Sequence, residues 1–289
     1  MYPFPTSELE MPVSENLSGL SRRSFFQKAS IASAASAAAL IGLVQSAPGY
    51  SQEPDAAARL NSPSPEAASS DGDILLAAEI AEALAVTTYT NIVRTSGWFT
   101  RIPDDDQGYL YAARNEEMSH YALEKSATGK DSPFTTFYYP KHMFADAQTT
   151  LNTLVALEDA FIAAYLVGVR FFSTADLRVT AARIMGIESD HRTLARSLAG
   201  DVAAQDGGPI AKITGLQGVP ENVHPPNNNG YERTQCWTSI QQAVTALLPF
   251  VDKAHATVAG FDPTKPHTFE PVSPHLATGL GNFISFTGC

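Results

Sequence analysis

The sequence predicts an all-α protein, a four-helix bundle with a fifth helix and an irregular C-terminal extension. Four segments between residues 72 and 200 repeat their apolar residues at helical spacing. No comparable stretch shows the alternation of apolar and polar residues that is typical of a strand. The chain also repeats its own pattern, first in one pair of helices and again in the next. These observations predict two helical hairpins packed as one bundle.

The four bundle helices are predicted at residues 72–96, 105–127, 145–172 and 174–199. Asp71 or Asp73 is available as the N-cap of the first helix, and Gly97 follows its last turn. Gly129 and Gly200 stand where a glycine commonly closes a helix, after the second and the fourth.

The remaining segments are predicted to be mostly irregular. Residues 128–142 contain two prolines and many aromatic residues, which predicts a loop or crossover. Residues 201–235 are rich in Gly, Pro and Asn and predict a long loop. A fifth helix is expected at 234–258, where Pro249 would kink or end it. The segment 201–289, with this helix and a proline-rich tail, is expected to pack on the bundle.

Residues 1–47 have the three parts of an export signal. Residues 21–28 (SRRSFFQK) carry two adjacent arginines followed by two phenylalanines, which resembles the twin-arginine type. An alanine-rich apolar run follows at 29–44, and Ser46 and Ala47 supply the small residues of a cleavage site. The alternative is an uncleaved membrane anchor, but the run is shorter than the roughly 20 apolar residues that a spanning helix needs.

This signal predicts a periplasmic or secreted protein, exported by the twin-arginine route, with no membrane span after processing. That route carries proteins that are already folded, so a metal site filled before export is compatible with it. Residues 48–71 are rich in Pro, Ala and Ser without apolar periodicity, which predicts a flexible linker.

The charge and the cysteines exclude some classes of protein. The formal net charge is -11 and only 17% of residues are charged, which argues against binding nucleic acid or an anionic membrane surface. The two cysteines, Cys236 and Cys289, do not form a CxxC motif, so the fold does not depend on a disulfide framework. They would pair in an oxidising compartment or stay free thiols; the sequence leaves both open.

The first and third helices share a Glu–Tyr spacing. Glu82 precedes Tyr89 by seven positions, and Glu158 precedes Tyr165 by the same interval. Seven residues are two helical turns, so each pair lies on one face. The tyrosines would donate hydrogen bonds or electrons at a nearby site, or serve as core aromatics with a satisfied hydroxyl.

The second and fourth helices share a Glu-x-x-His motif, at Glu117–His120 and at Glu188–His191. In both helices the motif is followed at identical spacing by Leu, Ser and Gly. Residues three apart on a helix point the same way, so each motif presents its two side chains together.

A Glu from each of two helices and Glu-x-x-His from each of the other two is the ligand pattern of di-iron and di-manganese bundles. Four carboxylates in a bundle core would repel and resist desolvation, at several kcal/mol for each ion. Two divalent cations cancel those charges, and an oxygen-rich set suits iron or manganese. The alternative is exposed helix salt bridges, which is the usual role of a Glu on a helix. The predicted ligands of two iron or manganese ions are Glu82, Glu117, His120, Glu158, Glu188 and His191.

Two further glutamates compete for these roles. Glu79 is one turn before Glu82, but no tyrosine lies seven positions after it. Glu116 has no histidine three positions later, whereas Glu117 does. The remaining C-terminal histidines lack ligand spacing and are expected on the surface or in core packing: His224, His255, His267 and His275.

Residues 73–199 resemble the ferritin-like superfamily, and specifically its exported, twin-arginine-bearing branch related to plant desiccation-related proteins. The resemblance rests on the two Glu–Tyr segments and the two Glu-x-x-His motifs. It implies that these positions are metal ligands. It does not select an activity, because relatives include ferritins, rubrerythrins, manganese catalases and oxygenases.

The leading functional hypothesis is an exported di-metal protein that is redox-active towards oxygen, peroxide or ferrous iron in stress protection. Its partners would be a small-molecule oxidant or metal ions, and homo-oligomerisation stays open. The alternative is a non-enzymatic stress-related protein with a structural metal site. A storage cage is a third hypothesis, which the long linker and the C-terminal extension disfavour.

Overall fold

The computed structural model describes residues 70–205 and 237–273. The predicted export signal at 1–47 lies outside the described residues, as do most of the predicted linker, most of the loop predicted at 201–235 and the end of the tail. Four residues discussed above also lie outside them: His224, Cys236, His275 and Cys289.

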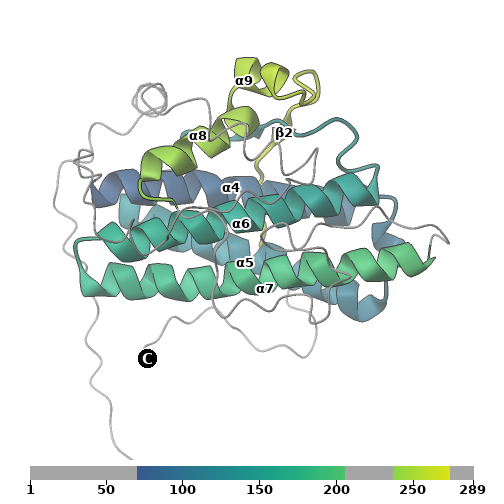
Figure 1. Ribbon diagram of the computed structural model, residues 1–289, viewed down its shortest axis with the longest axis horizontal. Helices are drawn as coiled ribbons and strands as arrows, with labels where there is room; N and C mark the ends of the chain where they lie inside the picture. Colours follow the sequence, from purple (N-terminus) through teal and green to yellow (C-terminus); the bar gives the residue numbers. More distant parts are fainter. Residues whose placement is uncertain (1–69, 206–236, 274–289) are drawn as a thin grey trace, which may run out of the picture.

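Four long helices run side by side along the long axis of the molecule (Figure 1). They are α4 (Asp71–Thr95), α5 (Asp104–Thr128), α6 (Ala147–Phe171) and α7 (Ala175–Gln205). Helix α4 packs chiefly on α5, and α6 packs chiefly on α7, so each predicted hairpin is a structural unit. A short 3₁₀-helix, Phe99–Arg101, lies between α4 and α5. The predicted all-α bundle is confirmed.

The start of α4 differs from the prediction. Its N-cap is Ser70, not Asp71 or Asp73, and the Ser70 hydroxyl accepts from the backbone N–H of Asp73 at 3.3 Å. The Asp73 carboxylate in turn accepts from the backbone N–H of Ser70, which completes a capping box. The aspartates were the wrong choice because Asp73 occupies the third helical position, where an acidic residue supports the cap.

The ends of α5 and α7 show that glycine closes a helix only in the right conformation. Gly129 follows α5 with φ 68°, in the left-handed region that an αL cap requires. Gly200 lies inside α7, which continues to Gln205, so the predicted end of the fourth helix was wrong. Glycine inside a helix costs roughly 1 kcal/mol relative to alanine, which the rest of a long helix can outweigh.

The connection between α5 and α6 is not wholly irregular. Strand β1 (Thr136–Phe137) pairs antiparallel with β2 (His267–Thr268) in the C-terminal tail. The register places Thr136 opposite Thr268 and Phe137 opposite His267. A two-residue strand is too short to show alternation in the sequence, and this pair joins the tail to the crossover without changing the fold class.

The predicted fifth helix is two helices, α8 (Ile240–Val251) and α9 (Lys253–Val258). Pro249 lies within α8, so the break comes later than the proline suggested. It falls at Asp252, whose carboxylate caps α9 by accepting from the backbone N–H of His255 at 2.9 Å.

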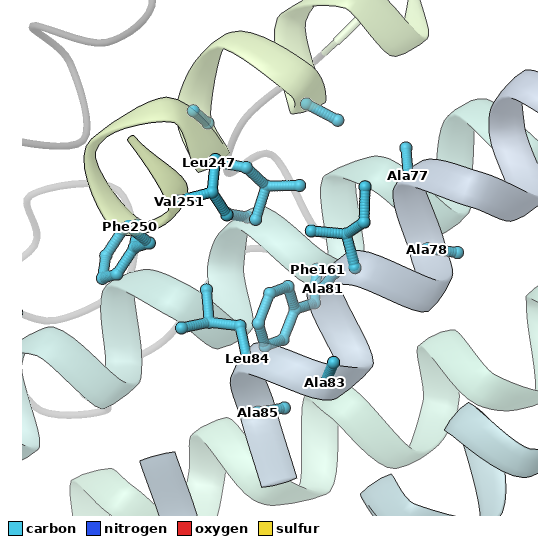
Figure 2. Packing of buried hydrophobic residues seen from close by; sticks show 14 of the residues in the cluster. Ala77, Ala78, Ala81, Ala83, Leu84, Ala85, Phe161, Leu247, Phe250 and Val251 are labelled. Carbon is cyan, nitrogen blue, oxygen red and sulfur yellow. The ribbon is translucent and has the colours of Figure 1, made fainter. Parts of the chain in front are cut away.

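Helix α8 packs against α4 and α6 and extends the hydrophobic core (Figure 2). Leu84 of α4 and Phe161 of α6 belong to the same buried cluster as Leu247 and Phe250 of α8. A second cluster, which includes Trp98, fills the other part of the bundle. In the described ranges, 70–205 and 237–273, no helix combines the length and hydrophobicity needed to cross a membrane.

Candidate metal centre

The six predicted ligand residues lie together in the core, and each bundle helix contributes at least one of them. They are Glu82 on α4, Glu117 and His120 on α5, Glu158 on α6, and Glu188 and His191 on α7. All six are buried; His120 is the most exposed, at 5%. A solvated helix face with surface salt bridges is therefore excluded for these residues.

The six side chains form two overlapping groups. The first group is Glu82, Glu117, His120 and Glu188, and the second group is Glu117, Glu158, Glu188 and His191. Within each group the ligand atoms lie within 4.8 Å of one another, which is a separation that one metal ion could span. Glu117 and Glu188 belong to both groups. Each group thus has one glutamate and one histidine of its own and shares two carboxylates with the other.

The Nδ1 atoms of the two histidines face the shared carboxylates. His120 Nδ1 lies 3.2 Å from Glu117 Oε2 and 3.3 Å from Glu188 Oε1. His191 Nδ1 lies 3.1 Å from Glu117 Oε1 and 3.3 Å from Glu188 Oε2. Each shared carboxylate therefore directs one oxygen towards each histidine, although Glu188 Oε1 accepts no hydrogen bond from the described residues.

Two ligand oxygens at the ends of the centre lack hydrogen bonds. Glu82 Oε2 and Glu158 Oε2 are buried, and neither accepts a hydrogen bond from the described residues. A buried carboxylate oxygen without a donor is costly unless a cation satisfies it. Glu82 Oε2 and Glu158 Oε2 are thus suitable ligand atoms for a hard or borderline divalent metal ion, one in each group.

The pKa values show how the cluster balances its charges with protons. Burial raises the pKa of Glu82 and Glu158 well above the usual carboxyl range, and neighbouring carboxylates raise it further. Burial opposes protonation of His120 and His191, but the surrounding carboxylates outweigh it and raise both pKa values well above the usual range. Burial also acts to raise the pKa of Glu117, yet the two histidines outweigh it and lower that pKa. A metal ion would displace these protons.

The two tyrosines connect the hairpins. The Tyr89 hydroxyl, on α4, donates to Glu158 Oε1 of α6 at 2.7 Å. The Tyr165 hydroxyl, on α6, is hydrogen-bonded to Glu82 Oε1 of α4. Each tyrosine thus orients the glutamate of the opposite hairpin. Both tyrosines are buried core aromatics with satisfied hydroxyl groups, and their partners are candidate ligands; a role in electron transfer stays a prediction.

Glu124 extends this network and was missed in the sequence. Its Oε1 lies 2.7 Å from the Tyr165 hydroxyl, which also contacts Glu82. A phenol has one proton, so one of these two contacts must use a carboxyl proton. Burial raises the pKa values of both Glu82 and Glu124 well above the usual range, so either carboxyl group can supply that proton. The signal was present, because Glu124 is two turns after Glu117 on the same face of α5.

The two competing glutamates have different roles. Glu116 Oε2 accepts from His191 Nε2 at 2.8 Å, so it holds the outer nitrogen of a candidate ligand. Glu79 accepts from the Thr128 hydroxyl at 2.9 Å and lies in neither group. Burial raises the pKa of Glu79 to about 7.

His191 of the second group has a hydrogen-bond partner, Glu116, that the repeat does not supply at the equivalent position for His120 of the first group. In the internal repeat the position equivalent to Glu116 is Ile187, one residue before Glu188. An isoleucine cannot accept a hydrogen bond from His120 as Glu116 accepts from His191. A buried ion pair, Arg192 Nη1 to Asp159 Oδ1 at 2.7 Å, also lies beside the second group. The two halves of the centre are therefore chemically unequal.

Two further described histidines, His255 and His267, belong to neither group. His255 contacts Asp252 at 2.6 Å on the surface of α9. His267 contacts Asn91 at 2.9 Å and packs against Tyr139. These two residues have structural contacts typical of surface and packing histidines.

Comparison with known proteins agrees with the motifs. Residues 70–201 match the family model described as a ferritin-like domain. The match spans a little under half of the chain and supports the ferritin-like superfamily. No curated protein matches the chain, and no solved structure does. The export route and the relation to desiccation-related proteins stay predictions.

Proposed function

We propose that this ferritin-like domain binds two iron or manganese ions and that the protein is an oxidoreductase acting on oxygen, peroxide or ferrous iron. The observation that carries the proposal is the pair of buried groups that share Glu117 and Glu188. Two shared carboxylates would hold two ions as neighbours instead of as separate sites. This arrangement is typical of a di-metal centre and is not needed for a single structural ion.

The ligand set supports the proposed metals. Four carboxylates can carry four negative charges, which two divalent cations cancel while the histidines bind as neutral imidazoles. Among the described residues, the two groups offer only carboxylate and imidazole ligands, which favours iron or manganese over metals that prefer sulfur.

The protein residues have distinct roles in this proposal. A bound pair of iron or manganese ions supplies the capacity to exchange electrons with a small oxidant. Glu117 and Glu188 would contribute to both metal positions, while Tyr89 and Tyr165 hold the carboxylates of Glu158 and Glu82 by hydrogen bonds. Glu116 fixes the ring of a histidine ligand, as carboxylates commonly do behind metal-bound imidazole.

Turnover by metal-loaded full-length protein tests the proposal. We expect hydrogen peroxide removal or oxidation of added ferrous iron, and we expect Glu158→Gln to lose that activity because one position loses its own carboxylate. The alternative, a structural metal site, draws support from the near-complete burial of all six residues. Bound metal without any turnover of peroxide or ferrous iron would favour that alternative.

Export and stress protection are also part of the proposal. The adjacent arginines Arg22 and Arg23, followed by an apolar run, support the twin-arginine route. Replacing both arginines with lysine should retain the protein in the cytoplasm. Unchanged export of that variant, measured by cell fractionation, would contradict the route.

Metal affinity is expected to rise with pH. His120 and His191 have raised pKa values, so both must lose a proton to bind a metal ion. Lower pH favours the protonated imidazoles and weakens binding, by about tenfold per pH unit for each proton released. Calorimetric titration in buffers of different ionisation enthalpy counts those protons. An affinity that does not change across the neutral range would contradict ligation by these histidines.

The two metal positions are expected to differ in affinity. Glu116→Ile copies the equivalent residue Ile187 and removes the acceptor from His191 Nε2. We expect one position to weaken about 10- to 100-fold while the other changes little. Glu116→Gln, which keeps an acceptor oxygen, is the matched control. Stepwise metal titration separates the positions, and equal weakening of both would contradict the assignment.

A further inference from the structure

An apolar cavity of about 90 Å³ lies in the bundle core, next to the candidate metal centre. Its α4 residues precede Glu82 and its α5 residues follow His120, so it lies towards the end of the bundle where α4 begins. All four bundle helices line it, and Ile240 of α8 also contributes. The wall is mostly aliphatic and aromatic side chains.

The internal repeat identifies positions where the cavity wall has a smaller side chain than the other half of the bundle. Aligning Glu82 with Glu158 and Glu117 with Glu188 relates one half of the bundle to the other. Four alanines of the wall then correspond to leucines in the other half; Ala81 corresponds to Leu157 of the first core cluster, and the other three correspond to leucines of the second. Those three pairs are Ala78 with Leu154, Ala127 with Leu198, and Ala181 with Leu110. These three leucines are buried in the second core cluster, so larger side chains occupy these three positions in the other half.

The cavity also has a polar end, formed by Glu124 and Tyr165. Glu124 is 3% exposed, and its Oε2 accepts no hydrogen bond from the described residues. The equivalent residue in the other half is Ala195, so packing of the bundle does not require a carboxyl group here. A buried acceptor without a donor is unfavourable, which indicates that a donor completes it. The proton between the Tyr165 hydroxyl and Glu124 Oε1 can belong to either residue. In both cases Glu124 Oε2 can accept a hydrogen bond from a ligand.

We propose that this cavity binds a small aliphatic molecule that ends in an O–H group, such as a short-chain alcohol or alkyl hydroperoxide. The aliphatic chain would lie against the alanine-lined wall, and the O–H would donate to Glu124 Oε2. An engineered cavity of about 150 Å³ accommodates benzene, so the smaller volume here suits about four or five non-hydrogen atoms. The bond from Tyr165 to Glu82 places the polar end of the ligand beside the candidate metal centre.

Binding of two isomers tests both the cavity and its polar end. 1-Butanol and methyl propyl ether have the same atoms, but only the alcohol has an O–H donor. Each is titrated into full-length protein freed of paramagnetic ions, and the methyl NMR signals of Leu75, Leu177 and Ile184 are followed. We expect saturable shifts with both probes and about twofold to tenfold tighter binding of the alcohol, the gain from one hydrogen bond.

Variants that copy the filled half supply the decisive comparison. Ala127→Leu and Ala181→Leu introduce the residues found at Leu198 and Leu110, and each should abolish binding of both probes. Glu124→Met should bind both isomers equally. Ala122→Leu, on the exposed face of α5, is the control and should bind like the wild type.

Circular dichroism identifies any filled variant that fails to fold, and the other filled variant then provides the test. Saturable binding that persists in a folded filled variant would overturn the cavity as the site. Equal affinity of the two isomers in the wild-type protein would overturn the role of Glu124.

Discussion

Replacing Glu117 with alanine is expected to remove both metal ions, whereas Glu158→Ala is expected to remove one. Glu117 belongs to both buried groups, while Glu158 belongs only to the second. The first variant also loses the stabilisation that bound metal supplies, about 2.7 kcal/mol for each site when free metal is 100 times the Kd of that site. Elemental analysis together with thermal unfolding, with and without added metal, measures both effects.

Two controls separate ligation from packing in this experiment. Glu117→Gln keeps the volume of the side chain, so loss of metal in that variant cannot be assigned to a new cavity. Glu79→Gln changes a buried glutamate that lies in neither group and should leave the metal content unchanged. Unchanged metal content in Glu117→Ala would contradict the ligand assignment.

Phe250→Ala is expected to lower the free energy of unfolding by about 3–5 kcal/mol, the usual range for a buried phenylalanine. Phe250 is 1% exposed on α8 and packs against the rings of Tyr139 and Phe261. Its backbone carbonyl also accepts from the N–H of Tyr138 at 2.8 Å. The substitution therefore leaves a cavity where α8 meets the crossover and the tail.

The neighbouring helix α9 provides a control for this prediction. Val258 is 88% exposed, and Val258→Ala should change the free energy of unfolding by no more than about 0.5 kcal/mol. Denaturant unfolding of the two variants gives the comparison. Equal stability of Phe250→Ala and the wild type would mean that α8 unfolds separately from the bundle.

The helices of the bundle could be predicted because their apolar residues recur over about seven turns. Periodicity did not give the helix ends, which depend on single contacts. Ser70 caps α4 because its hydroxyl reaches the N–H of Asp73. Gly129 ends α5 in the left-handed conformation, whereas Gly200 lies inside α7, which continues to Gln205. The β1–β2 pair was not predictable, because two residues carry no period and the partner strand is more than a hundred positions away.

The six candidate ligands could be found because the chain presents the same motif twice, and the structure brings all six together. Because the prediction relied on residues that occur in both halves, it gave little weight to residues that occur in only one half. Glu124, whose counterpart is Ala195, was missed, and Glu116, whose counterpart is Ile187, was considered only as a competitor of Glu117. The hydrogen bonds of Tyr89 and Tyr165 could not be predicted from the sequence, because spacing along one helix does not show that each tyrosine reaches a glutamate of the other hairpin.

The metal content of full-length protein from its native source tests the central claim most directly. Elemental analysis should find about two iron or manganese ions for each chain, one for each buried group of ligands. Little or no metal in protein handled without chelators would contradict the di-metal centre. The buried carboxyl groups would then be held by their protons and histidines alone.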